Sequence, residues 1–517
     1  MRSLMIVGTA SSVGKSIVCT GLCRIFYQDG VSVAPFKAQN MSLNSAVTPS
    51  GCEIGRAQAA QAEAAGIRPN EHMNPVLLKP TGNQRTQIVL QGRVYDTVSA
   101  RHYFRSYKET LWQAVVESYQ FLATRHDVIV MEGAGSPVEM NLKERDIANL
   151  RAAQMADAVV VLVADVDRGG VFASIVGTLQ LMTSEERKRV KGILINRFRG
   201  DPELFQDGVQ WLEQYAGLPV FGVIPYISNI GIDEEDSMAF ESERYRGAHS
   251  NSREDSAFVG QPQLRVAIVR LPHIANFTDF DPLFLEPDVE AFFTTDPVAL
   301  QKADAIILSG TKSTMSDLIW LFEHGLAAVI QQANQMGRMI FGICGGYQML
   351  GQRVFDPWHQ EDETHSECEG IGIFSYETTI AQEKETFLVE GELLAPFTGV
   401  SVSGYEIHMG KTTGLEQGHA FARVSASIGG PSQDHARIEG AVSDDGRIVG
   451  TYLHGIFHND EFRTRWLNQI RQSKGLPPKD DKVVIQNSRE DAYDRLADVV
   501  RSHLNLARVY ELLTREE

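Results

Sequence analysis

A chain of 517 residues is too long for one ordinary hydrophobic core, so we expect two or three domains. Hydrophobic residues make up 43% of the chain and charged residues 22%, which is typical of globular proteins. The formal net charge of -18 argues against a general binder of nucleic acid or anionic membranes, because both of these partners carry negative charge.

The five cysteines form neither a Cys-x-x-Cys pair nor a His/Cys cluster with zinc spacing, which favours a reducing compartment. The apolar N-terminus is interrupted at Gly8 before a secretory segment could form, and no later apolar run has the length of a membrane span. We therefore expect a cytoplasmic protein with no nucleic-acid or membrane partner. The sequence leaves the oligomeric state undefined.

In the first half of the chain, short runs rich in Val and Ile alternate with stretches of helical spacing. The runs show little polar alternation, as expected for strands that are buried on both faces. This order predicts an α/β fold with a doubly wound parallel sheet. The expected strands are residues 4–7, 31–35, 127–131, 158–163, 192–195 and 220–224, and the expected helices are residues 16–28, 54–66, 107–124 and 147–155.

Residues 8–16, GTASSVGKS, lie between the first expected strand and a helix, which is the context of a phosphate-binding P-loop. Backbone N–H groups, including those of Thr9 and Gly14, would face phosphate oxygens. Lys15 would neutralise phosphate charge, and the Ser16 hydroxyl would bind Mg²⁺. The spacing departs from the usual form, because Thr9 stands where the first glycine is expected. A Gly/Ser-rich surface turn is the alternative, and the Gly-Lys-Ser triplet argues against it.

Polar residues at the ends of three other expected strands would complete a nucleotide site. Glu132 ends a buried strand and is followed by glycines, so we assign its carboxylate to Mg²⁺. Asp165 is a second candidate for the metal, and residues 167–170 have the composition of a phosphate- or substrate-facing loop. Asn196 follows the strand at residues 192–195, where related folds contact the nucleotide base. Each of these residues could instead belong to an ordinary strand-end turn.

A charged and polar stretch separates the two halves of the chain, and a new strand pattern begins at Leu264. An insertion within one domain is the alternative interpretation. In the second half we expect α/β alternation with some antiparallel pairing. The expected domains are residues 1–236, a linker at 237–262, a second domain at 263–480 and a C-terminal helical segment at 481–517. The expected strands of the second half are residues 264–269, 305–308, 338–343, 387–394, 420–425 and 450–453.

Cys344 ends the apolar run of residues 338–343 and is followed by two glycines and a helical pattern. This order of strand, cysteine, tight turn and helix is typical of a nucleophile elbow. The turn lifts the side chain out of the sheet, and the helix N-terminus stabilises a thiolate and offers N–H groups to an oxyanion. The alternative is a small buried core residue. The position at the end of the run favours the nucleophile.

The chain resembles the cobyric acid synthase family, the glutamine-dependent amidases of cobalamin biosynthesis, nearly from end to end. The first half is similar to the dethiobiotin-synthetase-like P-loop ATPases, and the second half is similar to a class I glutamine amidotransferase domain. The motifs that carry the resemblance are APFKAQNMSLNS (residues 34–45), NPVLLKP (74–80), EGAGSP (132–137), SGYEIHMG (403–410) and YLHGIF (452–457).

The resemblance implies that glutamine is hydrolysed at Cys344 and that the ammonia passes to the ATP site of an amidoligase domain. There, ATP with Mg²⁺ would activate a corrinoid carboxylate as an acyl phosphate, which ammonia converts to an amide. The implied substrate is adenosylcobyrinic acid a,c-diamide, amidated at the b, d, e and g carboxylates. Alternatives are an a,c-diamide synthase of the same architecture and a P-loop partitioning ATPase with a vestigial second domain.

The resemblance also makes His454 the base for Cys344, although a structural histidine is the alternative. Many class I domains carry a glutamate two residues after this histidine, but here the position is Ile456. We therefore expect a Cys–His dyad and assign no third carboxylate. Glu406 and His408 could orient His454 or glutamine, or hold a turn.

Other assignments have weaker support from the sequence. Gly310 follows a strand and could donate to an oxyanion beside Gly345, or form a plain turn. Asp146 could position substrate or metal, or cap the next helix. The acidic corrinoid requires cationic side chains, and the candidates are Lys37, Arg56, Lys79, Arg85, Arg101 and Arg105, most of which we expect to be solvated.

Overall fold

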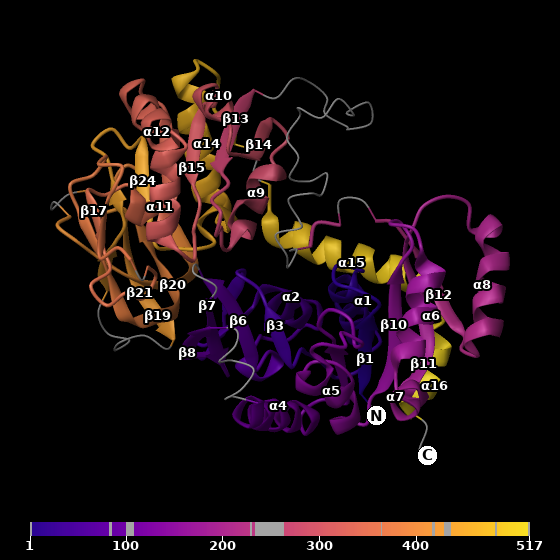
Figure 1. Ribbon diagram of the computed structural model, residues 1–517. Coiled ribbons are helices and arrows are strands. Elements are labelled where there is room, and N and C mark those ends of the chain that lie inside the picture. The colour runs from indigo at the N-terminus through magenta and orange to yellow at the C-terminus, as the bar shows by residue number, and fades with distance from the viewer. Residues whose placement is uncertain are drawn as a thin grey trace.

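A computed structural model describes residues 3–81, 85–99, 108–227, 230–232, 263–362, 364–415, 419–428, 436–480 and 483–514. The expected linker at residues 237–262 and the candidate residues Arg101 and Arg105 lie outside these ranges. The described residues form two α/β lobes, and the N- and C-termini both lie at the first of them (Figure 1).

The first lobe is built on a six-stranded sheet in which every neighbouring pair is parallel. The six strands expected in the first half all belong to it, so the doubly wound parallel sheet is confirmed. Its order is β12-β11-β10-β1-β9-β2. The strands are β1 (Leu4–Gly8), β2 (Val33–Phe36), β9 (Val128–Glu132), β10 (Val159–Asp165), β11 (Val190–Phe198) and β12 (Val220–Pro225).

Helices cover this sheet, and the P-loop joins β1 to the first of them, α1 (Lys15–Gln28). Because β1 lies between β10 and β9, the carboxyl ends of β9, β10 and β11 surround the loop. The other helices of the lobe are α2 (Arg56–Ala64), η1 (Glu71–Met73), α4 (Lys108–Ala123), η2 (Lys143–Arg145), α5 (Leu150–Met155), α6 (Val171–Leu181), α7 (Ser184–Arg189) and α8 (Pro202–Ala216).

The sequence did not predict a smaller, mostly antiparallel layer between β2 and α4. It holds a four-stranded sheet of order β3-β6-β7-β8 and a two-stranded ribbon of β4 and β5. Figure 1 shows that this layer faces the second lobe. The strands are β3 (Gln39–Met41), β4 (Ser45–Val47), β5 (Glu53–Gly55), β6 (Val76–Thr81), β7 (Arg85–Leu90) and β8 (Arg93–Ser99).

The second lobe has a sheet of order β14-β13-β15-β16-β24-β23, which is parallel except for β23. Its strands are β13 (Leu264–Val269), β14 (Val289–Thr294), β15 (Ala305–Leu308), β16 (Met339–Ile343), β23 (Ala441–Val442) and β24 (Ile448–Thr451). The helices of the lobe are η4 (Phe277–Phe280), α9 (Asp281–Phe284), α10 (Pro297–Gln301), α11 (Thr314–Glu323), α12 (Leu326–Gln335), α13 (Gly345–Met349), η5 (Ile456–His458) and α14 (Asp460–Ser473).

A further sheet contains the antiparallel pairing expected for the second half. Its order is β18-β17-β19-β21-β22, with β20 paired to β19. Figure 1 shows β19 and β20 next to β7 and β8 of the first lobe. The strands are β17 (Arg353–Phe355), β18 (Glu367–Glu369), β19 (Glu377–Leu393), β20 (Ser401–Thr413), β21 (Ala422–Ile428) and β22 (Arg437–Glu439).

The C-terminal segment forms two helices, α15 (Ile485–His503) and α16 (Leu506–Thr514), that return to the first lobe (Figure 1). Their apolar side chains join one buried cluster with those of α1 and the first sheet. At the contact, a Cβ built on Gly21 would lie 2.8 Å from Val500 Cγ2, so the helices pack closely there. Arg24 on α1 also forms salt bridges with Glu490 at 2.8 Å and Asp494 at 2.7 Å.

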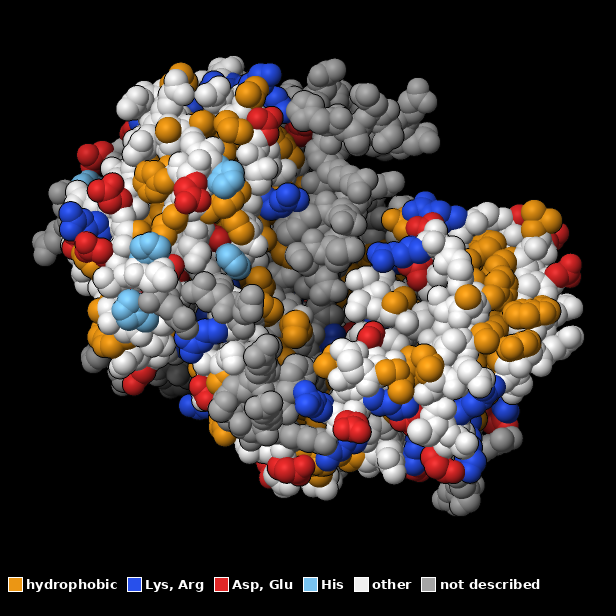
Figure 2. All heavy atoms as spheres, viewed as in Figure 1, with side chains coloured by type: hydrophobic (Ala, Val, Ile, Leu, Met, Phe, Trp, Pro, Cys, Tyr) orange, Lys and Arg blue, Asp and Glu red, His pale blue; other side chains and the backbone are white. Residues whose placement is uncertain are grey.

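Apolar side chains gather on the outer surface over α8 (Figure 2). They include Leu204, which is 84% exposed, and Trp211 and Tyr215, whose rings stack with centroids 5.1 Å apart. Among the described helices, none combines the length and apolar composition needed to cross a membrane.

Candidate active sites

Cys344 occupies a tight turn between β16 and α13, with φ 51° and ψ −110°. A non-glycine residue with positive φ is strained, and such strain is concentrated at functional sites. The glycines around it are required by close packing. A Cβ built on Gly346 would lie 2.2 Å from the Leu308 carbonyl oxygen. The turn therefore has the geometry of a nucleophile elbow.

His454 follows β24, the neighbour of β16, and its ring is buried. Its Nδ1 lies 2.7 Å from Asp279 Oδ2, and the other oxygen of Asp279 accepts a 3.0 Å hydrogen bond from the Gly455 N–H. The expectation of a dyad without a carboxylate was therefore wrong. Asp279 lies in η4, 175 residues before the histidine, and supplies the acidic partner that Ile456 cannot.

The charge around His454 favours the imidazolium form. Burial alone would lower its pKa, but the Asp279 carboxylate, the neighbouring Cys344 and hydrogen bonds to both groups raise the pKa of His454 to about 10. An imidazolium beside a cysteine stabilises a thiolate, and the contact of Nδ1 with Asp279 leaves Nε2 for another partner.

Gly310 lies next to the side chains of Cys344 and His454. A Cβ built on it would be 3.3 Å from His454 Cε1 and 3.7 Å from Cys344 Cβ. A side chain at this position would therefore make a tight contact with the His454 ring. This position is compatible with the expected role of Gly310 and Gly345 as oxyanion donors.

Glu406 and His408 pair with each other, with His408 Nε2 3.1 Å from Glu406 Oε2, and Arg437 donates to Glu406 Oε1 at 2.6 Å. Neither residue orients His454, because Asp279 makes the hydrogen bond to its Nδ1. His408 stacks on Tyr452 with ring centroids 3.8 Å apart, and it lines the pocket that contains Cys344.

At the P-loop site, the side chains of Lys15 and Ser16 form hydrogen bonds with neighbouring groups of the first lobe. Lys15 Nζ donates to the carbonyl oxygens of Ala10 and Gly135, both at 3.0 Å. Ser16 Oγ donates to Glu132 Oε1 at 2.8 Å, which places the hydroxyl beside the carboxylate.

Two residues that the sequence did not assign to the metal surround Glu132. Lys37 Nζ forms a salt bridge with Oε1 at 2.9 Å, and Gln61 Nε2 donates to Oε2 at 2.7 Å. Burial opposes the charge of Glu132, but Lys37 and the hydrogen bonds lower its pKa and keep it a carboxylate. The buried Oε1 of Gln61 has no hydrogen-bond partner among the described residues. A hydroxyl, a carboxylate and an unpaired amide oxygen are oxygen donors of the kind that Mg²⁺ prefers.

Thr9 and Asn196 both lie at the P-loop. The Thr9 N–H donates to the Val163 carbonyl oxygen at 2.9 Å, so the expectation that this N–H faces a phosphate was wrong. Asn196 Nδ2 donates to the Val13 carbonyl oxygen at 2.9 Å. A Cβ built on Gly14, whose φ is 95°, would lie 2.1 Å from Asn196 Nδ2. Asn196 therefore supports the P-loop through its hydrogen bond to Val13. Its contact with a nucleotide base stays a prediction.

The remaining candidates of the first lobe have structural partners. Asp165 forms a salt bridge with Arg197 at 3.1 Å. Asp146 Oδ1 accepts hydrogen bonds from the backbone N–H groups of Ala148 and Asn149 in the turn before α5, whose N-cap is Asn149, so Asp146 holds this turn and does not cap the helix. Arg85 donates to the Thr97 carbonyl oxygen at 2.7 Å.

Lys79 lies at the boundary between the lobes, in a buried ionic cluster. It donates to Glu53 Oε1 at 2.6 Å, and Lys384 of the second lobe donates to Glu53 Oε2 at 2.5 Å. Burial lowers the pKa of Lys384 to about 7, although Glu53 acts in the opposite direction. Lys79 and Lys384 line the same pocket as Cys344 and His454.

Lys312 and Glu361 line that pocket as well. Lys312 makes no ion pair within 4 Å and no side-chain hydrogen bond with any residue that the structure describes, and burial lowers its pKa. Burial raises the pKa of Glu361 to about 7, partly offset by Lys312. The pocket beside the nucleophile thus offers one unpaired cation and one acid.

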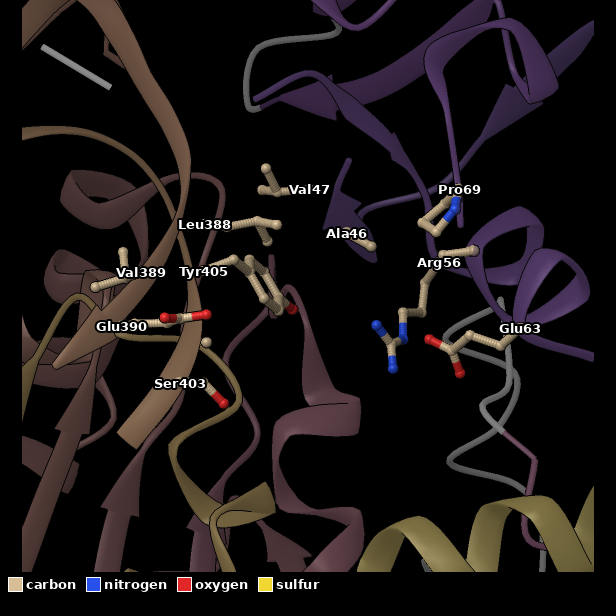
Figure 3. Close-up of a pocket in the computed structure, with 12 residues that line it drawn as sticks. Ala46, Val47, Arg56, Glu63, Pro69, Leu388, Val389, Glu390, Ser403 and Tyr405 are labelled. Atoms are coloured by element: carbon tan, nitrogen blue, oxygen red, sulfur yellow. The ribbon is translucent and has the colours of Figure 1, made fainter. Parts of the chain in front are cut away.

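A second cavity, of about 300 Å³, lies between the lobes (Figure 3). Arg56 and Glu63 of α2 border it on one side, and Leu388 and Tyr405 of the antiparallel sheet border it on the other. The Tyr405 ring stacks on His454 with centroids 5.2 Å apart, so this wall of the cavity is also the support of the catalytic histidine.

Comparison with known proteins connects the two sites. Residues 4–239 match the CobQ/CobB/MinD/ParA nucleotide binding domain, and residues 265–462 match the CobB/CobQ-like glutamine amidotransferase domain. A curated cobyric acid synthase of Caldanaerobacter subterraneus subsp. tengcongensis is 48% identical over 99% of this chain and 98% of its own. That of Klebsiella pneumoniae strain 342 is 45% identical over 100% and 99%. The chain belongs to the cobyric acid synthase family. It is therefore an ATP-dependent ligase with glutamine as the amide donor.

Family membership confirms the expected order of a P-loop domain and a glutamine amidotransferase domain. It also disfavours both alternatives, because the full-length relatives are cobyric acid synthases and Cys344 has an intact His–Asp partner pair. The Thermotoga maritima PurLQS structure aligns with 40% of this chain and 99% of its own, at 17% identity and a TM-score of 0.31.

Proposed function

We propose that this chain converts adenosylcobyrinic acid a,c-diamide to adenosylcobyric acid by amidating the b, d, e and g carboxylates. Each amide consumes one glutamine and one ATP. The observation that carries the proposal is the presence, in one chain of this family, of a Cys344–His454–Asp279 site and a P-loop site with Lys15, each on its own parallel sheet.

Glutamine hydrolysis starts when Cys344 Sγ attacks the side-chain carbonyl carbon, while the oxyanion accepts hydrogen bonds from Gly310 and Gly345 N–H groups. His454 gives its Nε2 proton to the leaving nitrogen, so the C–N bond breaks and ammonia departs from a thioester. Neutral His454 then takes a proton from water, whose oxygen attacks the thioester. The C–S bond then breaks, so Cys344 leaves as a thiolate beside the protonated His454, and glutamate departs after its new carboxyl group loses a proton to solvent.

Lys312 and Glu361 bind the amino-acid end of glutamine in this proposal. An unpaired ammonium suits the α-carboxylate, and a carboxylate suits the α-ammonium. Both groups lie in the pocket of Cys344, which supports this assignment. Lys312 and Glu361 would distinguish glutamine from amides that lack the α-carboxylate and α-ammonium groups, because such amides would leave these two buried side chains without a partner.

At the P-loop site, Ser16 and Glu132 hold Mg²⁺, which when bound offsets phosphate charge during phosphoryl transfer. Lys15 binds the phosphates of ATP, and the loop backbone at Gly14 orients them. A corrinoid carboxylate oxygen attacks the γ-phosphorus and ADP leaves. Ammonia then attacks the acyl carbon, and phosphate departs as the amide forms.

The product mass tests the proposal. Purified protein with ATP, glutamine and the a,c-diamide should give a product with four added amides, and a Cys344→Ser variant should do so only with added ammonia. Two amides added to unamidated cobyrinic acid, with none added to the a,c-diamide, would show that the acceptor is wrong. Equal glutamine-driven synthesis by the variant would show that Cys344 is not the nucleophile.

A further inference from the structure

Asn276 contacts the catalytic histidine on one side and the first lobe on the other. Its Nδ2 lies 3.4 Å from His454 Nε2, and its Oδ1 accepts a 2.8 Å hydrogen bond from the Ser45 N–H. Because a backbone N–H can only donate, Oδ1 must face Ser45. The atom that faces the histidine is therefore the donor Nδ2.

The same short loop contacts both ring nitrogens of His454, since Asp279 at Nδ1 follows Asn276 by three residues. Asn276 is 4% exposed and has φ 53°, a left-handed conformation that asparagine tolerates better than most residues. The next N–H, that of Phe277, donates to Asn44 Oδ1 of the first lobe at 3.3 Å. The start of the loop is thus fixed by Asn44 and Ser45.

The contacts continue within the first lobe toward the nucleotide. The Arg56 N–H, at the start of α2, donates to the Asn44 carbonyl oxygen at 3.1 Å. Gln61, further along α2, donates to Glu132, which holds Ser16 of the P-loop. Figure 3 shows Ala46, which follows Ser45, opposite the Tyr405 wall that supports His454.

We propose that Asn276 is a positioning residue for His454, held by Asn44 and Ser45 of the ATP-binding lobe, so that the glutaminase site is complete only when the two lobes are docked. This inference rests on the proposed role of Cys344, His454 and Asp279. A donor at Nε2 favours the neutral imidazole, which is the form that must activate water at the thioester. Asn276 therefore counteracts Asp279, which favours the charged form.

The test compares variants of the full-length protein in two assays, glutamine hydrolysis and amidation driven by added ammonia. Asn276→Gly keeps the left-handed backbone accessible and removes the amide. Asn276→Asp keeps the acceptor for Ser45 and removes the donor. Asn468→Ala is the matched control, because Asn468 bonds the Lys479 carbonyl oxygen in the same lobe away from the site.

We expect Asn276→Gly to lower kcat for glutamine hydrolysis by about 10- to 100-fold, the usual cost of losing a partner that orients a catalytic group. KM for glutamine and ammonia-driven amidation should stay near wild type. Asn276→Asp should move the acidic limb of the kcat profile to higher pH, because it removes the donor to Nε2 and places a carboxylate beside the imidazolium.

A wild-type kcat and pH profile in both variants would overturn the proposal. So would an equal fall of ammonia-driven amidation, because that result indicates general damage to the fold. Failure of the proposed function is a separate result, since it would be seen as undiminished glutamine hydrolysis by Cys344→Ser.

Discussion

Asp279 Oδ2 lies 2.7 Å from His454 Nδ1, although the two residues are 175 positions apart in the chain. This contact fixes the tautomer of the histidine with its proton on Nδ1 and leaves Nε2 for Cys344.

An Asp279→Asn variant removes this carboxylate while keeping the shape of the side chain. We expect glutamine-driven amidation to fall by roughly 10²- to 10⁴-fold, because the amide no longer stabilises the imidazolium or enforces the tautomer. Ammonia-driven amidation should be retained, and product formation with each nitrogen source measures both. Asp296→Asn is the control, since asparagine can keep the capping bond to Val298. Full glutamine-driven activity of Asp279→Asn would contradict the role of the carboxylate.

A Lys15→Ala variant should lose amidation and keep glutamine hydrolysis, whereas Asp279→Asn should lose only glutamine-driven amidation. Loss of the P-loop ammonium removes phosphate binding, so amidation should fall by at least about 100-fold with glutamine and with ammonia alike. Basal glutamine hydrolysis should persist, because its residues lie on the other lobe. The exposed Lys188, which pairs with Glu185 on α7, provides the matched Lys188→Ala control. Amidation at the wild-type rate in Lys15→Ala would contradict the nucleotide assignment.

The pKa of Glu361, about 7, predicts a pH-dependent affinity for glutamine. Below pH 7 the side chain is mostly a neutral acid, and above pH 7 it is a carboxylate that attracts the α-ammonium. KM for glutamine should therefore fall as pH rises from about 6 to 8, and Glu361→Gln should have a higher KM without this change. Initial rates of glutamate formation across that range provide the measurement. Parallel profiles for both proteins would disprove contact between Glu361 and glutamine.

Leu496 on α15 is 1% exposed and belongs to the cluster that joins the C-terminal helices to α1. Leu496→Ala should lower the free energy of unfolding by about 2–5 kcal/mol, the usual cost of a truncated core leucine. Leu204→Ala is the control, because that side chain is 84% exposed. Urea unfolding followed by fluorescence compares the two variants. Equal midpoints would indicate that the contact contributes little stability.

The elements that could be predicted share a local signal. Runs of Val and Ile identified all six strands of the first sheet, and glycines at fixed offsets identified the turns at Lys15 and Cys344. Asp279 has no such signal, because it lies in a short irregular turn and reaches His454 only through the tertiary fold. The same reason applies to Gln61 and Asn276, whose partners come from distant segments.

The antiparallel layer of β3 to β8 was missed because β3, β4 and β5 have only three residues each, whereas β6, β7 and β8 mix apolar with charged residues. The packing of α15 on α1 could not be predicted from the sequence either. An amphipathic pattern indicates that one face of a helix is covered, but it does not identify the element that covers it. Expectations were most reliable for buried parallel strands and least reliable where the two lobes meet.

The return of α15 and α16 to α1 affects how this protein can be made. The ATP-binding lobe takes its first strand from the beginning of the chain and its last helices from the end, with the whole amidotransferase lobe encoded between them. During translation this lobe cannot bury the face of α1 that packs against α15 until α15 leaves the ribosome. The ammonia-producing lobe has all of its sheets before then, so the ammonia-consuming lobe is the last to be completed.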